Sequence, residues 1–277
     1  MEDDTDTLVL YYDDVHQDVV SDLEFYLSET AAYQPRILEV GCGTGRLLLR
    51  FAEQGRAVFG IDISSPALDM LRGKLELADI EVSSRVGYEI GDIRNYSPDL
   101  GFDVVIFANQ GFLSLLTIDD QILALSQMRR ILNPGGVVMI DFFEPNSRAI
   151  GDGLKPEAAA PRIVRLGENA TERVPLLRGD GYLVHWIKSD WDTMSQIVSH
   201  TMVIDEVGTD GRVRSRRYAD LPQRWVYRFE FEHLAARCGF RVKHLYGGPE
   251  RGPHRTTGQQ LFWVLQPLSD DGEAVPV

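Results

Sequence analysis

The sequence has 277 residues, 44% of them hydrophobic, and a formal net charge of −14 at pH 7. This length suffices for one domain with an insertion, or for a large and a small lobe. Because binding to the nucleic-acid backbone normally requires a basic surface, the negative charge argues against a nucleic-acid partner.

Neither a membrane nor an oxidising compartment is indicated. No apolar run approaches the ~20 residues that a spanning helix needs, and the acidic N-terminus is unlike a signal peptide. Two cysteines, Cys42 and Cys238, are too few for a disulfide framework and are predicted to be reduced thiols. We therefore expect a cytoplasmic protein that acts on a small molecule, with no membrane partner; a homodimer is left open.

The first predicted elements are a tail and a helix. Residues Met1 to Thr7 are polar and predict a solvated tail. From Asp13 to Tyr33 apolar side chains recur at spacings of three and four, which predicts one amphipathic helix that covers the sheet.

The stretch from Arg36 to Asp62 predicts a strand, a glycine-rich turn, a helix and a second strand. Gly41, Gly43 and Gly45 alternate in the turn, where missing Cβ atoms permit positive φ and a ligand close to the backbone. Asp62 follows the first glycine by about 20 residues, the separation at which a carboxylate meets ribose hydroxyls in doubly wound nucleotide sites. A tight turn without any ligand is the alternative.

The glycine spacing distinguishes two cofactors that such a unit can bind. A dinucleotide fingerprint has the pattern G-x-G-x-x-G, whereas these glycines follow G-x-G-x-G. Glu39, two residues before the first glycine, would repel a pyrophosphate but could accept a hydrogen bond from the α-ammonium of a methionine moiety. The pattern therefore favours S-adenosylmethionine (SAM).

The same stretch resembles motif I of the class I SAM-dependent methyltransferases. Further motifs follow in the order that the family has: Asp62 at the end of the second strand, Gly91-Asp92-Ile93 near the end of the third, and Leu132-Asn133-Pro134-Gly135-Gly136 before the fifth. The resemblance extends from about Arg36 to Asp141.

The resemblance implies SAM as the cofactor and S-adenosyl-L-homocysteine as its product. It implies that Ile63 packs against adenine, that Asp92 binds the adenine amino group and that Ile93 covers the ring. In many relatives a tyrosine near the position of Tyr12 lies over the SAM carboxylate. The residues predicted to bind the cofactor are Tyr12, Glu39, Gly41, Gly43, Gly45, Asp62, Ile63, Asp92, Ile93 and Asn109. No His or Cys cluster has metal-ligand spacing, so no metal site is predicted.

Further apolar runs predict the third strand, Val86 to Ile90, and a central fourth strand, Phe102 to Phe107. Ligands lie beyond the carboxyl ends of the strands in an open parallel sheet, so the residues that follow the fourth and fifth strands face the reactive end of the site. Acceptor contacts are predicted there for Gln110, Phe112 and Phe143, with ordinary loop packing as the alternative for Phe112.

The pattern changes after Ser147. Glycine, proline and charged residues predict a linker or lid as far as about Gly181, and period-two stretches then predict three antiparallel strands. These strands are Tyr182 to Ile187, Gln196 to Val207 and Arg212 to Leu221. His185 and Trp186 point to opposite faces of the first of them, and we expect Trp186 to contact the acceptor, with burial in the core as the alternative.

Arg224 begins a stretch that resembles the R-x-x-x-x-x-E-x-x-x-L-x-x-x-G-F ending of many small-molecule methyltransferases, and it is predicted to contact the acceptor. The last two strands are predicted at Phe240 to Tyr246 and Gln259 to Leu265, as a hairpin at the sheet edge. The residues between them, Gly247 to Thr257, are predicted to form a mobile loop.

These elements predict an α/β fold: a Rossmann-like, doubly wound, mostly parallel seven-stranded sheet with a terminal antiparallel hairpin, plus an inserted antiparallel β region. The predicted parts are the SAM-binding core with its N-terminal helix at residues 1–146, the linker or lid and β insertion over the acceptor site at 147–222, and the last helix and two strands, which complete the core, at 223–277.

The predicted function is methyl transfer from SAM to nitrogen or oxygen of a small molecule, such as an amino sugar, an amino acid derivative or another natural-product intermediate. The acidic composition leans toward a cationic amine. No motif identifies a proton acceptor, and His185, His200 and Glu144 are equal candidates. Two alternatives stay open: a SAM-binding protein of the same fold that transfers no methyl, such as a pericyclase or a regulator, and an NAD-dependent or nucleotide-sugar oxidoreductase, which the glycine spacing disfavours.

Overall fold

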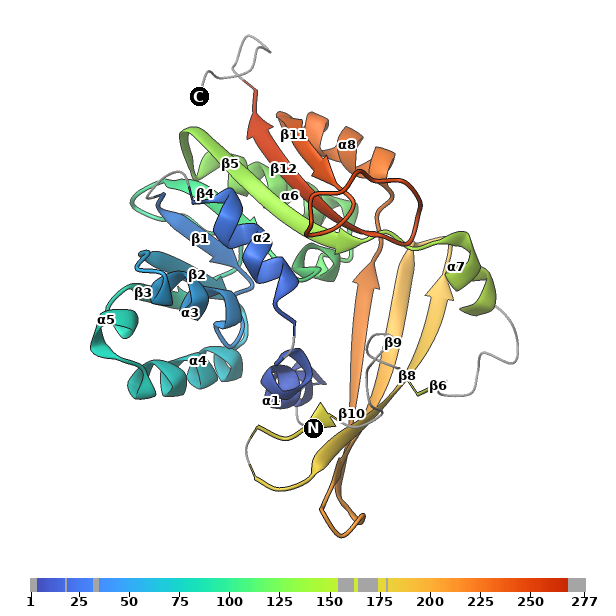
Figure 1. Cartoon of the computed structure of the whole chain (residues 1–277). Helices are drawn as coiled ribbons and strands as arrows, with labels where there is room; N and C mark the ends of the chain where they lie inside the picture. The colour runs from blue at the N-terminus through green and yellow to red at the C-terminus, as the bar shows by residue number, and fades with distance from the viewer. Residues whose placement is uncertain are drawn as a thin grey trace. The chain divides into compact units, whose positions relative to one another are not determined.

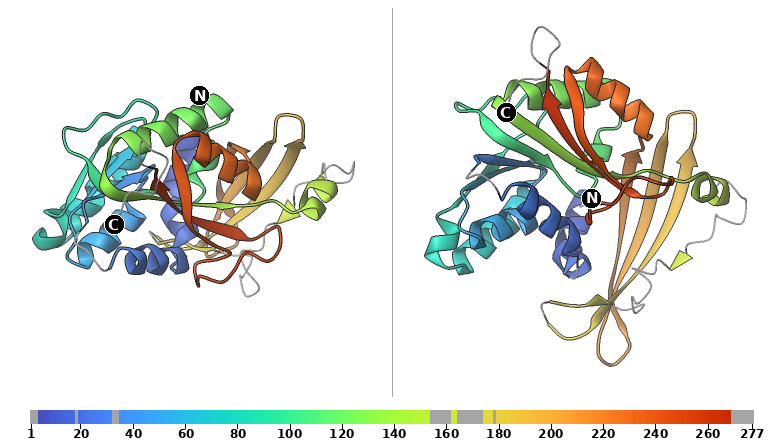
Figure 2. Two further views of the ribbon diagram at one scale, coloured as in Figure 1. Left: turned by 90° about the horizontal axis from the view of Figure 1, so that it is seen from above. Right: turned by 45° about the horizontal axis from the view of Figure 1, so that its top comes forward.

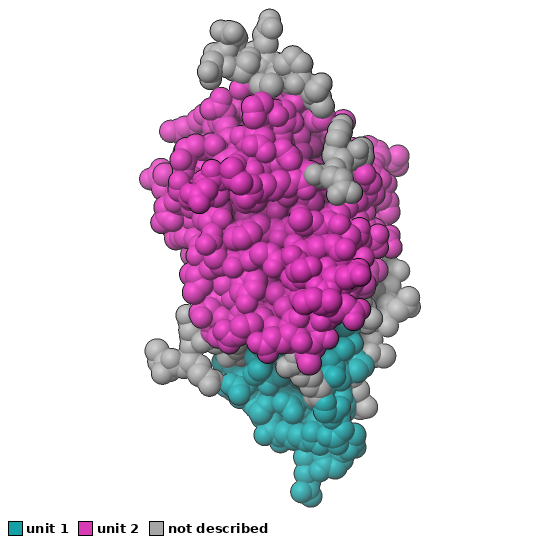
Figure 3. Space-filling view, turned by 90° about the vertical axis from the view of Figure 1, so that its left-hand side faces the viewer, with its two compact units in different colours: residues 1–18, 146–223 teal, residues 19–145, 224–277 magenta. Residues whose placement is uncertain are grey.

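The computed structural model describes residues 4–17, 19–31, 35–153, 162–163, 174–177 and 179–268. The chain forms two compact units (Figure 3). We call residues 19–145 and 224–277 the core unit, and residues 1–18 and 146–223 the insertion unit. Residues 1–18, which the sequence grouped with the core, thus cluster with the insertion.

The core unit contains the predicted seven-stranded sheet, with strand order β11-β12-β5-β4-β1-β2-β3 (Figure 1). Its strands are β1 (Ile37–Val40), β2 (Val58–Asp62), β3 (Val86–Ile90), β4 (Phe102–Phe107), β5 (Leu132–Phe143), β11 (Phe240–Tyr246) and β12 (Gln260–Pro267). The first five strands are parallel, and β12 pairs antiparallel with both β5 and β11. The fold class predicted from the sequence is confirmed.

Helices cover both faces of this sheet (Figures 1 and 2). They are α2 (Ser21–Glu29), α3 (Arg46–Glu53), α4 (Ser65–Leu77), α5 (Ile80–Ser83), η1 (Gly111–Ser114), α6 (Ile118–Arg130) and α8 (Arg228–Arg237). Alternate residues of the strands face opposite sides, so Val105 packs with α6 and α8 while Val104 and Ile106 pack with α2 and α3. Burial on both faces explains why the parallel strands are apolar throughout.

Three boundaries differ from the predictions. The single helix predicted from Asp13 to Tyr33 is wrong: the chain forms two helices, α1 (Asp4–His16) and α2, which belong to different units. The motif Leu132 to Gly136, predicted to precede the fifth strand, lies within β5, since its first residue already pairs with Phe102 of β4. The predicted tail also differs, because α1 begins at Asp4.

The insertion unit is an antiparallel sheet with α1 and α7 (Ser147–Gly153). Its strands are β6 (Arg162–Ile163), β7 (Val174–Pro175), β8 (Tyr182–Asp192), β9 (Ile197–Val207) and β10 (Val213–Arg224). Tyr11 of α1 packs against Leu183 and Ile204 of this sheet, and the Asp14 carboxylate accepts a hydrogen bond of 2.6 Å from the backbone of Leu177. The three predicted strands are present: β8 and β10 are longer than predicted, and β9 begins one residue later than predicted. Residues 154–161, 164–173 and 178 of the predicted linker lie outside the described residues.

No described helix is both long enough and apolar enough to cross a membrane. The two cysteines, Cys42 and Cys238, are unpaired and buried.

The aromatic cluster under α8 predicts a measurable stability difference between two phenylalanines of that helix. Phe231 is fully buried and contacts Phe112, Phe142 and Trp263, whereas Phe229 is 66% exposed. Phe231→Ala should lower the free energy of unfolding by ~3–5 kcal/mol, because it leaves a cavity. The matched control, Phe229→Ala, should change it by less than about 1 kcal/mol. Guanidinium unfolding followed by tryptophan fluorescence measures both, and equal losses would contradict this packing.

Candidate active site

The three alternating glycines form the turn between β1 and α3, and each has a positive φ: 66° at Gly41, 54° at Gly43 and 82° at Gly45. Their surroundings differ. A Cβ at Gly45 would lie 2.3 Å from a methyl carbon of Leu71 in α4, so this glycine allows the helices to pack. A Cβ at Gly43 would meet no atom within 4 Å, so the backbone there borders open space that a ligand can enter.

Glu39 lies in β1 directly before this turn and is only 6% exposed. Its Oε2 atom is buried and has no hydrogen-bond partner among the residues that the structure describes. Burial, followed by the nearby carboxylates Asp62 and Asp22, raises the pKa of Glu39 well above its ordinary value, and Arg46 opposes that rise. Since unpartnered buried acceptors are costly, this oxygen is suited to receive a donor from a ligand.

Asp62 ends β2 beside the glycine turn. One carboxylate oxygen accepts 2.7 Å from the backbone N–H of Gly43, and the other accepts 2.8 Å from that of Ser64. Burial raises the pKa of Asp62, while these backbone N–H groups lower it. Each oxygen has a second lone pair, so the carboxylate can hold the turn and also accept hydrogen bonds from a pair of hydroxyls.

The residues predicted to surround adenine differ in exposure. Ile63, next to Asp62, is 71% exposed at the end of β2, an unusual position for an isoleucine unless a ligand covers it. Ile93 is buried in the core cluster below the sheet end. Packing in the core is therefore enough to explain the burial of Ile93, and its contact with a ligand stays a prediction.

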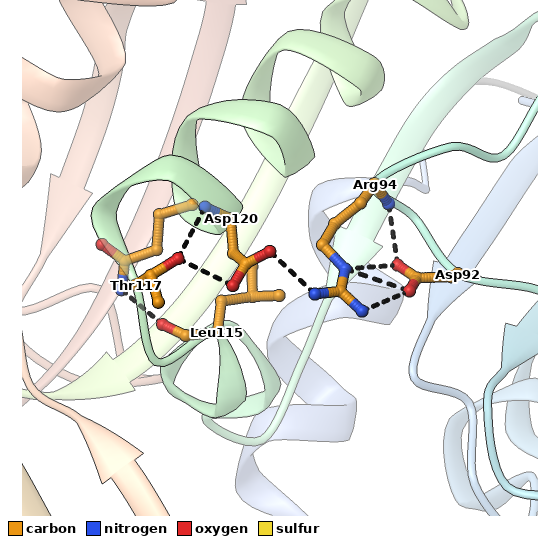
Figure 4. A network of polar contacts seen from close by, with 6 residues as sticks. Asp92, Arg94, Leu115, Thr117 and Asp120 are labelled. Atoms are coloured by element: carbon orange, nitrogen blue, oxygen red, sulfur yellow. Dashed lines mark hydrogen bonds and ion pairs between the residues drawn. The ribbon is translucent and has the colours of Figure 1, made fainter.

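Asp92 is held by Arg94 (Figure 4). The guanidinium donates to both carboxylate oxygens of Asp92, at 2.5 Å to 3.0 Å, and also donates 2.7 Å to Asp120 at the start of α6. These hydrogen bonds keep the pKa of Asp92 below its ordinary value. Asp92 is thus a carboxylate acceptor fixed in place, and its predicted contact with an adenine amino group stays a prediction.

Taken together, these residues fit SAM. Glu39 offers an unpartnered acceptor for the ammonium, the turn at Gly43 offers open space, and Asp62 and Ile63 offer a carboxylate and an exposed apolar side chain for a nucleoside. When bound, SAM supplies a methyl carbon that its sulfonium makes electrophilic. Among the described residues no group of three or more His, Cys, Asp or Glu side chains is placed to hold a metal ion.

A buried carboxylate, Asp141 of β5, organises the neighbouring strand ends. It accepts hydrogen bonds from the Tyr26 hydroxyl at 2.5 Å, the Asn109 backbone at 2.8 Å and the Gln260 amide at 2.7 Å. Burial raises the pKa of Asp141, and the three donors oppose that rise. The sequence reasoning treated Asp141 only as a strand end and Tyr26 as an apolar helix residue. A carboxylate inside the apolar run Ile140 to Phe143 was the available signal.

This network shapes the loop after β4. Asn109 and Gln110 have φ of 50° and 62°, left-handed values that are uncommon for two successive non-glycine residues. Their backbone N–H groups donate to the side chain and the backbone carbonyl of Asp141, which hold them there. Strained loops of this kind gather at functional sites.

The predicted acceptor residues of the core unit fall into two groups. Phe143 is 46% exposed at the end of β5, and Gln110 is partly exposed. Phe112 is fully buried among aromatic rings, and Arg224 is 4% exposed with its guanidinium donating to Gln121 and Glu230. Packing explains the burial of Phe112, and the hydrogen bonds to α6 and α8 explain that of Arg224. Contacts of these two residues with the acceptor stay predictions.

The insertion unit holds the remaining predicted residues. Tyr12 of α1 stacks on His16, and Trp186 of β8 is half-buried on the face opposite to His185. His185 is buried, and Nδ1 of His200 lies 2.8 Å from the Ser189 hydroxyl. Burial lowers the pKa of both histidines, which favours their neutral forms. The roles predicted for Tyr12 and Trp186 stay predictions.

Glu144, the third candidate proton acceptor, is paired with a residue that the sequence reasoning passed over. Its Oε2 lies 3.1 Å from Nε2 of His254, and its Oε1 accepts 2.9 Å from the backbone N–H of Arg228 in α8. His254 belongs to the loop Gly247 to Thr257, which the sequence predicted as mobile and unassigned. No motif signals this pair, because 110 residues separate its members.

Comparison with known proteins agrees with this site. Residues 37–136 match the family model of a methyltransferase domain. The chain is 36% identical over 118 residues to the cypemycin N-terminal methyltransferase of a Streptomyces species, across 42% of this chain and 46% of that protein. The chain spans only 38% to 51% of the length of the first relatives that it matches.

Solved structures extend the similarity to the whole fold. The CcbJ methyltransferase from Streptomyces caelestis superposes with a TM-score of 0.72 at 23% identity over 90% of each chain. SAM-bound CalS10, an amino pentose methyltransferase from Micromonospora echinaspora, gives 0.61 at 22% identity over 90% of each chain. At such identity the likeness shows the fold.

Residues 37–136 thus match a methyltransferase domain, as the motifs predicted, and the fold of the chain is that of solved methyltransferases. The prediction of SAM as the cofactor agrees with this match.

The unpartnered oxygen of Glu39 predicts that SAM affinity depends on pH. Between about pH 5 and 7 the α-amino group of SAM stays protonated, because its pKa is near 8. Because its pKa is raised, Glu39 of the free protein keeps its proton to a higher pH than an ordinary carboxyl group does, so SAM affinity should rise with pH and binding should release a proton. Glu39→Gln should bind weakly and without this rise. Titration calorimetry in two buffers measures both effects; a flat wild-type profile would contradict the ammonium contact.

The position of Asp62 predicts that SAM affinity depends on this carboxylate and not on exposed carboxylates elsewhere. Asp62→Asn places an amide donor where ribose hydroxyls and backbone N–H groups need acceptors, so SAM affinity should fall by ~1.5–3 kcal/mol, about tenfold to a hundredfold. Asp69→Asn, the same change at an exposed carboxylate of α4, is the matched control and should have no effect. Equal affinities for the two variants, measured by calorimetry, would overturn the ribose assignment.

Proposed function

We propose that this protein transfers the methyl group of SAM to an amine nitrogen of a small molecule. The observation that carries the proposal is the buried, unpartnered Oε2 of Glu39 beside the open backbone of Gly43. It supports a SAM whose ammonium lies on Glu39 and whose ribose lies on Asp62. The sulfonium end then lies toward the ends of β4 and β5, near Asn109 and Phe143.

Three observations favour an amine as the acceptor. The formal net charge of −14 attracts a cationic substrate. One relative is named for methylation at an N-terminus, and one structural neighbour is named for an amino pentose, so both names denote an acceptor that carries an amine. Exposed Phe143 and the polar side chain of Gln110 offer apolar and hydrogen-bonding contacts for such a molecule.

The chain's own contribution is mainly to position the reactants. A nucleophile held in line with the carbon–sulfur bond gains much of the rate from proximity and orientation. The β4 loop, fixed by Asp141, supplies a rigid surface for that alignment. The contribution of the insertion unit, through Trp186 and the β sheet, is part of the proposal and rests on the sequence pattern.

The proposal also includes the setting of the reaction. The two buried, unpaired thiols are in keeping with a cytoplasmic location. The acidic composition supports the proposal that nucleic acid is not a partner. A homodimer is left open.

Transfer of a labelled methyl group tests the proposal. The purified protein is incubated with methyl-labelled SAM and with glucosamine, alanyl-alanine or a small-molecule extract, and the products are fragmented in a mass spectrometer. We expect label on nitrogen of one compound class, and less of it with Asp62→Asn than with the control Asp69→Asn when SAM is below saturation. SAM that binds while no label moves under any condition would contradict methyl transfer and favour a non-methylating SAM protein. Label on oxygen would contradict the amine.

A further inference from the structure

The pair of Glu144 and His254 lies beyond the carboxyl end of β5, the edge at which the proposed reaction takes place. Glu144 follows β5 directly, and its backbone N–H donates a hydrogen bond of 3.1 Å to the carbonyl of Gln259, the residue before β12. The side chains are 3% and 12% exposed. Both residues belong to the core unit.

The contacts of Glu144 fix the orientation of the imidazole. Its carboxylate has two donors, the Arg228 backbone at Oε1 and His254 Nε2 at Oε2. Because a carboxylate can only accept, Nε2 carries the hydrogen, and in the neutral ring Nδ1 keeps a free lone pair. Among the described residues Nδ1 has no hydrogen-bond partner. The pair therefore has the arrangement of a base held by an acidic residue.

The loop that carries His254 is fastened at several points. The backbone N–H of Gly247 donates 2.8 Å to the carbonyl of Gly252, and a Cβ at Gly247 would lie 2.8 Å from the Cα of His254. Arg251 of the same loop forms an ion pair of 2.5 Å with Glu29 of α2. His254 is thus held by backbone packing as well as by Glu144.

Other basic and acidic groups of this edge already have partners or ligands assigned. Asp141 accepts from three donors, Asp92 pairs with Arg94, and Glu39 and Asp62 are assigned to the cofactor. The other histidines of the core unit lie elsewhere: His233 is exposed on α8, and His244 lines a cavity with Asp103 and Pro134 at the opposite, amino ends of the strands.

We propose that His254, oriented by Glu144, is the proton acceptor for the amine substrate. This inference rests on the proposed function. The acceptor enters as an ammonium, and one of its protons passes to Nδ1. The freed nitrogen lone pair forms the new bond to the methyl carbon, while the electron pair of the carbon–sulfur bond goes to sulfur. S-adenosyl-L-homocysteine and a methylated ammonium result, and the proton on His254 passes to solvent. His254 is then a catalytic residue and Glu144 a positioning residue.

Two variants of His254 test the role. His254→Ala should lower the rate of methyl transfer to glucosamine or alanyl-alanine, at saturating SAM, by about 10²–10⁴-fold. SAM affinity should stay unchanged, and added imidazole should restore part of the rate. His254→Gln keeps a donor toward Glu144 but has no basic nitrogen, so it should be as slow as His254→Ala. His233→Ala, a histidine exposed on α8, is the matched control and should keep the wild-type rate.

The outcomes that overturn the inference differ from those that overturn the proposed function. A His254→Ala rate within about threefold of wild type, or a normal rate for His254→Gln, would leave His254 with a structural role. If the wild type methylates no amine, the proposed function fails. NMR of histidine labelled with nitrogen-15 still shows which ring nitrogen of His254 carries the hydrogen, and so tests the pairing with Glu144. We expect the neutral imidazole of His254 to carry its hydrogen on Nε2, and a hydrogen on Nδ1 of the neutral ring would overturn the inference.

Discussion

The buried carboxylate of Asp141 is the constraint on which the site end of the core sheet depends. A carboxylate without partners in such a place would cost several kcal/mol, so the chain must bring donors to it. The donors come from α2, from the loop after β4 and from β12, through Tyr26, Asn109 and Gln260. One charge therefore joins three segments that lie far apart in the sequence, and it sets the backbone of the β4 loop.

The two halves of the site follow from this arrangement. On one side of the sheet, the turn after β1 and the end of β2 make a cradle in which Glu39 and Asp62 supply carboxylates at different depths. On the other side, β5 continues past Asp141 to Phe143, and Glu144 follows it. There the proposed amine substrate meets its proposed proton acceptor, His254. The unpartnered oxygen of Glu39 indicates a ligand more clearly than any of the polar groups that already have partners.

The sequence predicted the core sheet and the cofactor turn because both follow from local patterns. Apolar runs fix the buried parallel strands, and the spacing of Gly41, Gly43 and Gly45 is a property of five successive residues. The break between α1 and α2 was missed since the two helices continue one apolar period across residues that carry the chain between units. The pairing of Glu144 with His254 was missed for a different reason: it joins two loops 110 residues apart, and only the folded sheet brings them together.

A crystal structure with bound S-adenosyl-L-homocysteine tests the central claim most directly, because it locates every part of the cofactor against this edge of the sheet. The account predicts the ammonium within hydrogen-bond distance of Glu39 Oε2, the ribose hydroxyls on Asp62 and the adenine against Ile63. A cofactor bound elsewhere, or an ammonium that leaves Glu39 Oε2 without a partner, would contradict it.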